Sequence, residues 1–361
     1  FEYWDQQFLN NNQFAFNNEI SGLIWLKVRA INRKKQLNNF LDRNPDLSIL
    51  GKKQKEIGIE LYNELLSLPN GMQRLDDFLL DRSQETYALK NVDVARLKND
   101  LYKVTSYNWG GDQNNSLDKF LVSHYVKPIS SFEELLSKSA KIGANAWNYV
   151  QNSWYNNWTS YLIETIFESN KRVVSAVGEI KSVDFFIDNY PIDLKVTFFP
   201  NQYLQEKLKP FYQGKSEISW LKSKAKENSI SFDTTQNDAA IYYQITESMR
   251  LQGYNQILDI LNSNHCTVVS EAENNPKELM TWLYTHQGEM RFGAENHIFV
   301  VMVNMEDMSQ SWKMKREFDI IEPKLKTFLD NFDDNSLKQV DYQFKGNSYH
   351  SLSGIIFIKN L

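Results

Sequence analysis

The sequence has one cysteine, Cys266, and no long uninterrupted run of apolar residues. A single cysteine excludes an internal disulfide framework and a cysteine-rich zinc site, and it favours a reducing compartment. The longest apolar runs, such as 298–303, are far shorter than the roughly 20 residues that a membrane-spanning helix needs. We also find no signal peptide pattern, so we expect a cytoplasmic protein with no membrane partner.

Several common functional signatures are missing as well. There is no Walker loop, no dinucleotide-binding fingerprint and no Gly-x-Ser-x-Gly elbow, and the five histidines show no metal-ligand spacing. A net charge of -5 does not support nucleic-acid binding as a bulk property, although local patches can still bind. Lysines cluster within 207–226, and a second basic group contains Lys313, Lys315 and Arg316. A solvated surface is the simpler interpretation of either group.

What the chain does have is length and apolar content. Its 361 residues are 42% hydrophobic and 14% aromatic, which is enough to bury a large core. Residues 1–140 carry apolar side chains at helical spacing, for example in 20–41 and 57–68. This part shows no catalytic spacing, and scaffold, dimerisation and target recognition stay open as its roles. We therefore predict a helical N-terminal domain over 1–140 and a second domain over 141–361.

The second domain reads as alternating helices and strands. Apolar and aromatic residues recur at three- and four-residue steps and predict a helix over 146–168; they are Trp147, Val150, Trp154, Trp158, Tyr161 and Thr165. The remaining predicted elements are a strand at 172–177 ended by Gly178, a hairpin at 183–199, a polar irregular segment at 200–236, a helix at 238–261, a strand at 266–269, a helix at 276–284, a strand at 297–303, a helix at 323–328 and a strand at 354–358.

The hairpin at 183–199, with the sequence VDFFIDNYPIDLKVTFF, is the stretch around which the domain is organised. Two apolar runs flank Asn189-Tyr190, which we predict to be a two-residue turn. This turn pairs Asp188 with Pro191 and places Asp184 opposite Lys195.

Alternation along the strands then sorts the side chains of the hairpin by face. Asp184, Asp193 and Lys195 emerge on one face, because residues two apart or directly opposite share a face. The other face is apolar and suits a core; it holds Phe185, Ile187, Ile192, Leu194 and Val196.

An aspartate followed by Asp193-Leu194-Lys195 on the next strand resembles the D…(D/E)xK signature of the PD-(D/E)xK, or restriction-endonuclease-like, nucleases. Val183 stands where that family commonly has proline. The predicted order of helix, three strands, helix and strand is also similar to the core of these nucleases. The resemblance implies an α/β fold with a restriction-endonuclease-like αβββαβ core and a mixed sheet, preceded by the mainly helical N-terminal domain.

The resemblance also implies a magnesium site. Asp184, Asp193 and the backbone carbonyl of Leu194 are expected to bind Mg²⁺, for which Mn²⁺ can substitute, and Glu164 on the preceding helix is expected to bind metal or orient water. Clustered carboxylates repel one another, so their pKa values should be raised without a cation. The same carboxylates favour the charged form of Lys195, so we expect Lys195 to position water and stabilise the transition state rather than to act as a base.

Two other glutamates are rivals for the third carboxylate. Glu168 lies four residues after Glu164 near the end of the predicted helix, and Glu179 belongs to a second ExK sequence in an apparent turn. We prefer Glu164 to either of these two glutamates.

Arg291 and His297 have an Arg-x5-His spacing that resembles the motif of helical HEPN ribonucleases. In that family the histidine is expected on a helix, whereas His297 leads into a predicted strand.

The functional expectation is a metal-dependent endonuclease that cleaves DNA, with a type II restriction enzyme or a related bacterial anti-phage nuclease as the setting that the resemblance implies. One site in each chain would favour a homodimer for cutting both strands. Two alternatives stay open: a non-catalytic nucleic-acid-binding or scaffold protein that retains the fold, and an RNA-directed nuclease.

Overall fold

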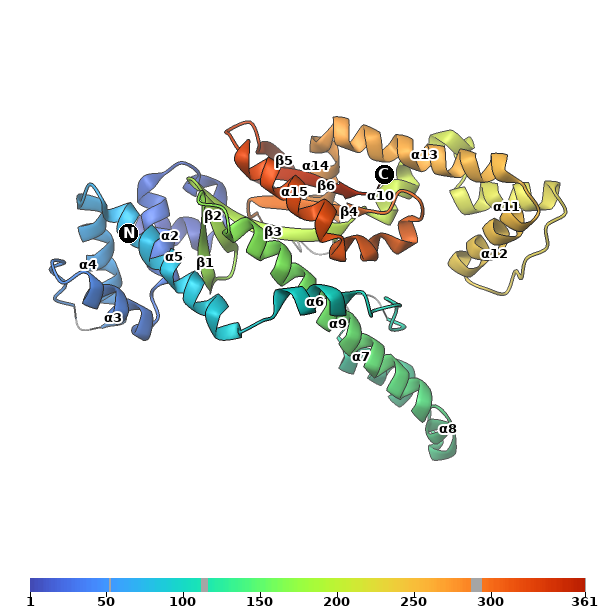
Figure 1. Ribbon diagram of the computed structural model, residues 1–361, viewed down its shortest axis with the longest axis horizontal. Coiled ribbons are helices and arrows are strands. Elements are labelled where there is room, and N and C mark those ends of the chain that lie inside the picture. The colour runs from blue at the N-terminus through green and yellow to red at the C-terminus, as the bar shows by residue number, and fades with distance from the viewer. Residues whose placement is uncertain (52, 112–115, 287–293, 361) are drawn as a thin grey trace.

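The computed structural model describes residues 1–51, 53–111, 116–286 and 294–360 (Figure 1). The strands are β1 (Val173–Ile180), β2 (Val183–Ile187), β3 (Tyr190–Phe198), β4 (His297–Val303), β5 (Lys338–Phe344) and β6 (Asn347–Lys359). The α-helices are α1 (Glu2–Leu9), α2 (Ile20–Ala30), α3 (Lys34–Arg43), α4 (Gln54–Ser67), α5 (Gly71–Lys90), α6 (Val94–Leu101), α7 (Leu117–Leu121), α8 (Phe132–Ser137), α9 (Ser139–Glu168), α10 (Asn201–Leu208), α11 (Glu217–Glu227), α12 (Asp238–Leu251), α13 (Asn255–Asn274), α14 (Pro276–His286) and α15 (Phe318–Asp330). The 3₁₀-helices are η1 (Gln13–Phe16), η3 (Lys209–Tyr212) and η4 (Met308–Arg316), and η2 (Val122–Val126) is a π-helix.

The strands form one mixed sheet of six in the order β1-β2-β3-β4-β6-β5. β1, β2 and β3 are an antiparallel meander, β4 is parallel to both β3 and β6, and β5 closes the far edge against β6 in antiparallel pairing. The prediction of an α/β fold with a mixed sheet is therefore confirmed. None of the described helices is both long enough and apolar enough to cross a bilayer.

Three apolar cores cover the two faces of the sheet. On one face, α9 and α15 pack against alternate residues of β2, β3, β4 and β6, such as Phe185 and Ile298; we call this the α9/α15 core. On the other face, α2 and α5 pack on β1 and β2 around Phe186, in a cluster that extends to α4 (the N-terminal core), and α14 packs on β5 and β6 near Phe299, in a cluster that extends through α10–α13 (the distal core). The polar side chains of β3 emerge on this second face, between the two cores.

The hairpin turn is one residue earlier than predicted. Asp188-Asn189 forms the turn, Ile187 pairs with Tyr190 and Phe185 pairs with Ile192. Asp188 takes a left-handed φ of 49°, a conformation that Asp and Asn tolerate better than most residues and that tight hairpins require. The predicted pairing of Asp188 with Pro191 is therefore wrong, because Pro191 pairs with Phe186.

The corrected register changes which residues lie opposite each other in the hairpin, but every side chain stays on the face predicted for it. A pairing shift of two residues leaves each side chain on its original face. One step beyond the Phe185–Ile192 pair, Asp184 lies opposite Asp193 instead of opposite Lys195. The apolar face has the expected composition: Phe185, Ile187 and Ile192 are buried in the α9/α15 core, and Leu194 and Val196 pack against it.

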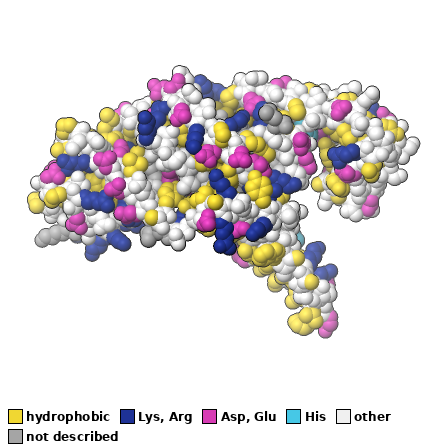
Figure 2. Space-filling view, in the orientation of Figure 1, with side chains coloured by type: hydrophobic (Ala, Val, Ile, Leu, Met, Phe, Trp, Pro, Cys, Tyr) yellow, Lys and Arg dark blue, Asp and Glu magenta, His cyan; other side chains and the backbone are white. Residues whose placement is uncertain are grey.

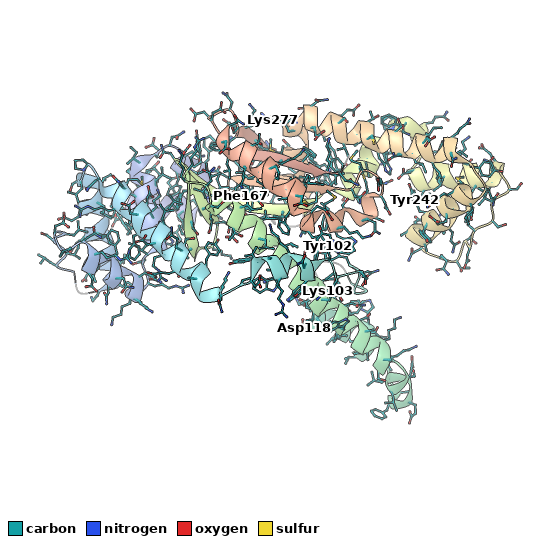
Figure 3. The ribbon with its side chains drawn as sticks, in the orientation of Figure 1. Tyr102, Lys103, Asp118, Phe167, Tyr242 and Lys277 are labelled. Atoms are coloured by element: carbon teal, nitrogen blue, oxygen red, sulfur yellow. The ribbon has the colours of Figure 1, made fainter. Side chains whose placement is uncertain are left out.

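α9 is the longest helix and connects the sheet to a projecting arm. It begins at Ser139, seven residues before its predicted start, and ends at Glu168. Its C-terminal end, which carries Phe167 (Figure 3), reaches the sheet. There the Phe167 ring stacks on Phe185, with 5.1 Å between the ring centroids. Its N-terminal half extends away from the sheet together with α7 and α8 (Figure 1).

Other element predictions are wrong in informative ways. Segment 200–236, predicted to be irregular, contains α10 and α11, and 266–269, predicted to be a strand, lies inside α13. β5 was not predicted. β1 does not end at Gly178: it continues to Ile180 through an irregularity at which Val177 and Gly178 have positive φ angles.

The basic clusters do not form one continuous patch. Lys207, Lys222 and Lys224 each pair with a carboxylate, and acidic and basic side chains are interspersed over the face seen in Figure 2. Lys315 and Arg316 are buried rather than solvated. Arg291, half of the Arg-x5-His pattern, lies outside the described residues, and His297 begins strand β4 as predicted.

Candidate active site

The candidate site lies where β2 separates from β3. The β2–β3 ladder ends at the pair of Phe185 with Ile192, whereas β3 continues beside β4 to Phe198. Asp184 and Asp193 follow this last pair on the face that the N-terminal and distal cores flank. Asp184 Oδ2 accepts a hydrogen bond of 2.7 Å from the backbone N–H of Leu194, so its carboxylate is held against β3 beside Asp193.

The backbone of Leu194 faces the gap between the two strands. In an extended strand, the N–H and C=O groups of one residue point to the same edge, and those of the next residue point to the other. The Asp193 N–H donates to the carbonyl of Asn296 beside β4, at 2.9 Å. The Leu194 carbonyl therefore lies on the β2 side with Asp184, which is the orientation that the predicted role as a ligand requires.

Asp193 is held by two cationic or protonatable side chains. The Lys195 ammonium forms a salt bridge with Asp193 Oδ2, and His297 Nε2 lies 3.2 Å from the same oxygen. Burial acts to raise the pKa of Asp193, but the hydrogen bonds and charges of His297 and Lys195 outweigh it, and the pKa of Asp193 is lowered. Asp193 is therefore an anion at neutral pH.

The carboxylates around Asp184 have the opposite tendency. Burial, with a further contribution from the charge of Asp193, raises the pKa of Asp184 to about 6. Burial followed by the charges of Glu168 and Asp184 raises the pKa of Glu164 to about 7. Glu164, on the last turns of α9, is thus close enough to Asp184 for their charges to interact, and a cation placed among these groups would relieve the repulsion.

The two rival glutamates are engaged elsewhere. Glu168 accepts hydrogen bonds from Tyr87 and, at 3.0 Å, from Ser83, both on α5. Glu179 lies in β1 rather than in a turn, and its carboxylate is 2.5 Å from Arg33 Nε. These contacts account for the positions of both glutamate side chains without a bound metal. Glu164 therefore remains the candidate carboxylate on the helix.

His297 shows no metal-ligand spacing in the sequence, and the structure gives it a specific position beside Asp193. It is fully buried, it pairs with Asp193 across the β3–β4 ladder, and burial lowers its pKa. Its Nδ1 lies 2.7 Å from the hydroxyl of Tyr284, which in turn lies 2.7 Å from Ser353 Oγ. A polar residue at the start of the otherwise apolar run 297–303 was the only sequence signal.

Glu295 is a second residue that the sequence analysis missed. Its Oε2 is buried and has no hydrogen-bond partner among the described residues. Burial raises its pKa to about 7, and the negative charge of Asp193 contributes. Glu295 also lines a small cavity with Gln13 and Ser182. It is therefore a further carboxylate near the pair of aspartates, contributed by the residues that lead into β4.

Asn296, the residue between Glu295 and His297, joins three distant parts of the chain. Its fully buried side chain donates to Asn17, at 2.6 Å, and to the carbonyl of Pro191, at 3.1 Å. Its Oδ1 accepts from the backbone N–H of Leu352, at 2.9 Å. The N-terminal segment, the start of β3 and β6 are thereby fixed relative to one another directly beside the aspartates.

The assembled groups are oxygen ligands with one ammonium. Two adjacent carboxylates and a backbone carbonyl are suitable ligands for a hard divalent cation such as Mg²⁺. Among the described residues, no three His, Cys, Asp or Glu side chains are arranged closely enough to hold a metal by themselves. The candidate site consequently consists of the Asp184–Asp193 pair, with Leu194 and Lys195 at its edge and Glu164 and Glu295 nearby.

Comparisons with protein-family models, with curated proteins and with solved structures found no match to this chain.

Proposed function

We propose that the protein is a metal-dependent endonuclease that hydrolyses phosphodiester bonds in DNA. The observation that carries the proposal is the placement of Asp184, Asp193 and Lys195 on one face, at the point where β2 and β3 diverge. This is the constellation that the D…DxK pattern of the PD-(D/E)xK nucleases requires.

The order of elements supports the same proposal. α9 precedes the β1–β2–β3 meander, a helical segment follows, and β4 then lies parallel to β3. This order is similar to the αβββαβ core of restriction-endonuclease-like nucleases. In this chain the helical segment between β3 and β4 is enlarged to α10–α14, and β5 and β6 extend the sheet.

The donor set fits a hard divalent cation, and Asp184, Asp193 and the Leu194 carbonyl would hold it. When bound, Mg²⁺ or Mn²⁺ supplies Lewis-acid activation of water and neutralises developing phosphate charge. The Lys195 ammonium would bind a phosphate oxygen and stabilise the negative charge of the transition state. Glu164, whose pKa is about 7, can accept a proton from the attacking water near neutral pH.

The test is cleavage of plasmid DNA with Mg²⁺ by the wild-type chain and by Asp193→Asn. This variant keeps the size of the side chain and removes the charge, and we expect it to lose at least about 100-fold in rate while its thermal unfolding stays cooperative. Asp188→Asn is the matched control, because Asp188 lies in the turn of the same hairpin and pairs with Arg172 on the surface.

Full activity of Asp193→Asn, or equal losses in both variants, would reject the site. Parallel digestion of RNA and DNA separates a ribonuclease from a deoxyribonuclease. A homodimer is part of the proposal because one site in each chain must act on both strands, and it predicts linear plasmid rather than nicked circles as the first product.

A further inference from the structure

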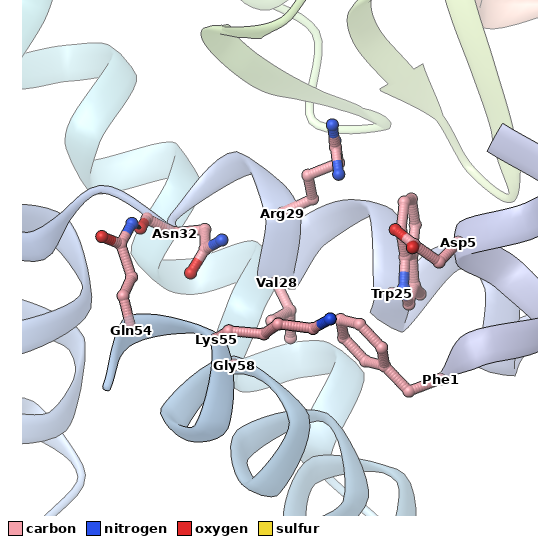
Figure 4. A pocket seen from close by; sticks show the side chains of 9 residues that line it. All are labelled: Phe1, Asp5, Trp25, Val28, Arg29, Asn32, Gln54, Lys55 and Gly58. Atoms are coloured by element: carbon pink, nitrogen blue, oxygen red, sulfur yellow. Dashed lines mark hydrogen bonds between the residues drawn. The ribbon is translucent and has the colours of Figure 1, made fainter. Parts of the chain in front are cut away.

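A cavity in the N-terminal helical part and the projecting arm of α9 both lie outside the candidate active site. The cavity has a volume of about 380 Å³ and lies between α1, α2 and the first turns of α4 (Figure 4). Its lining contains one acid, Asp5, and two cations, Arg29 and Lys55, so its charges select no single class of ligand. The projecting arm has a more specific composition.

The part of α9 that forms the arm lacks charged side chains. Between Lys141 and Glu164 the sequence contains no Asp, Glu, Lys or Arg, although these types make up 24% of the chain. A helix with a solvent-exposed face normally carries charged residues on that face. Depletion of charge together with enrichment in aromatic residues is instead the composition of the buried centre of a protein interface.

The exposed residues of this helix follow the spacing of a coiled coil. Gly143, Trp147, Val150, Trp154 and Asn157 succeed one another at steps of four, three, four and three residues, which is the a/d spacing of a heptad repeat. We call these five residues the arm seam. All five are exposed, with Trp147 at 65%, Val150 at 55% and Trp154 at 37%. A Cβ on Gly143 would meet nothing within 4 Å.

The opposite side of the helix is covered by the protein's own chain. The ring of Tyr149 contacts Trp109, with 4.9 Å between the ring centroids, and Asn145 donates a hydrogen bond of 2.8 Å to the hydroxyl of Tyr125 in η2. At 3.6 residues per turn, Asn145 and Tyr149 lie on the side of α9 turned away from the arm seam. The seam therefore faces outward from the arm that projects in Figure 1.

We propose that the arm seam binds the arm seam of a second copy of this chain, as an antiparallel pair of helices. In such a pair the a positions of one helix pack against the d positions of the other. Val150 then lies opposite the partner's Trp154, and Trp147 lies opposite the partner's Asn157. Each layer joins a tryptophan to a smaller side chain, and the Trp147 indole N–H can donate to the carbonyl oxygen of Asn157.

The sizes and charges of the seam favour this occupant and this orientation. A parallel pair would place Trp147 on Trp147 and Trp154 on Trp154, which crowds two layers and leaves Val150 against Val150 between them. Because the seam and its flanks carry no charge, two identical copies meet without like-charge repulsion. A nucleic acid or a membrane surface is bound through Lys or Arg side chains, which this part of the helix lacks.

This interface would serve the homodimer of the proposed nuclease, and only that use rests on the proposed function. The pairing itself rests on the arm and is measured without cleavage. In the single chain the seam is exposed, so substitutions at Trp147 or Val150 should leave its unfolding nearly unchanged at concentrations below the dissociation constant of the dimer. Loss of association is thereby separated from loss of folding.

The first test places a charge in the seam. Val150→Glu puts a carboxylate into a central layer of the pair, and Val126→Glu is the matched control. Val126 is 61% exposed on η2, which lies on the covered side of α9 next to Asn145. Sedimentation velocity over a range of about 1 to 100 μM measures the dimer. We expect the wild type and Val126→Glu to dimerise equally, and Val150→Glu to have a dissociation constant at least about tenfold higher.

The second test fixes the orientation in a Cys266→Ser background, which removes the native thiol. In the antiparallel pair, Ser153→Cys lies within one helical turn of its counterpart, so a short bismaleimide should link the two chains. Ser160→Cys is the matched control at the equivalent heptad position, and its counterpart lies about 24 Å away along the axis at 1.5 Å per residue. A parallel pair would link both variants equally.

The proposal is overturned if the wild type is a monomer at about 100 μM, if Val150→Glu dimerises as tightly as Val126→Glu, or if Ser160→Cys is linked as efficiently as Ser153→Cys. A wild-type dimer that responds to Val150→Glu but cleaves no DNA supports the arm pairing and rejects the proposed function. DNA cleavage by a monomeric wild type does the reverse.

Discussion

His297 Nε2 lies 3.2 Å from Asp193 Oδ2, and the imidazole is fully buried between the sheet and Tyr284. This contact joins two strands that are about a hundred residues apart in the chain. It holds the Asp193 carboxylate on the side of β3 where Lys195 and Asp184 lie, and it helps to keep the pKa of Asp193 low. His297 is thus a positioning residue for the candidate site.

Replacing His297 tests that role. In His297→Leu the pKa of Asp193 should rise, because burial is then opposed by Lys195 alone. The carboxylate also loses the contact that holds it beside Asp184, so the cleavage rate at pH 8 should fall at least about tenfold. His297→Gln keeps an N–H donor and should lose less. Cleavage rates at pH 8 provide the measurement, and equal rates for the wild type and both variants would remove His297 from the site.

The raised carboxyl pKa values predict how stability depends on pH. Glu164 and Asp184 have folded-state pKa values of about 7 and about 6, whereas unfolded carboxyl groups titrate near pH 4. Between these values the folded state binds more protons than the unfolded state, so the free energy of unfolding should fall as the pH rises from about 4 to 7. Urea denaturation at several pH values measures this slope.

Repeating these measurements with Mg²⁺ distinguishes the effect of metal binding on stability from the effect of carboxyl protonation. The cation should stabilise the protein more at pH 8 than at pH 5, because the carboxylates are then ionised. The double variant Glu164→Gln with Asp184→Asn should reduce the slope between pH 4 and 7, leaving the part that comes from Glu295, whose pKa is also about 7, and it should lose the effect of Mg²⁺. An equal gain from Mg²⁺ at both pH values would contradict the assignment of these groups.

Replacing the buried Lys315 by an apolar residue should stabilise the folded protein. Its ammonium is buried, donates to Asn156 Oδ1 at 2.9 Å and lies 5.0 Å from the Phe198 ring centroid, and burial lowers its pKa to about 8. Below pH 8 the folded state therefore carries a desolvated charge, and this penalty fades as the pH rises from about 8 to 10.5. Lys315→Met should stabilise the protein by about 2 kcal/mol at pH 7 and less at pH 10.

Lys313→Met is the comparison for that prediction, because Lys313 lies on the same short helix and is only partly buried. It should change the free energy of unfolding by no more than about 0.5 kcal/mol at either pH. Chemical denaturation at pH 7 and pH 10 measures both variants. Destabilisation by Lys315→Met at pH 7 would show that the hydrogen bond to Asn156 outweighs the desolvation of the ammonium.

Removing one ring of the stacked pair of Phe167 and Phe185 should cause a large loss of stability. Both rings are fully buried at the end of α9, so Phe167→Ala should cost about 3–5 kcal/mol through lost burial and a cavity. Trp147→Ala on the projecting half of α9, where the side chain is 65% exposed, should cost less than about 1 kcal/mol. Similar urea midpoints for the two variants would be inconsistent with this packing.

The faces of the hairpin could be predicted because alternation is a local property of a strand. The turn could not be fixed, since Asp188-Asn189 and Asn189-Tyr190 are both plausible two-residue loops, and only packing against the neighbouring strands selects one. Because the two registers differ by two residues, the error left the grouping of Asp184 with Asp193 unchanged.

The residues that β4 and its preceding segment contribute to the site could not be predicted from the sequence. Nothing local to His297 or Glu295 indicates that β4 lies parallel to β3 next to Asp193, because that pairing spans the whole of α10–α14. The run 266–269 was misread as a strand for a related reason. Val268 and Val269 are β-branched, but their burial in the distal core within α13 overrides that weak preference.

The contacts of Asn296 also limit when the site can form during synthesis of the chain. Its side chain needs Asn17 from the beginning of the chain and the backbone of Leu352 from near its end. During synthesis from the N-terminus, β2 and β3 leave the ribosome long before these partners are all present. The two aspartates therefore reach their final positions only after both Asn296 and Leu352 have emerged, and a translation product that stops before Leu352 would lack a finished site.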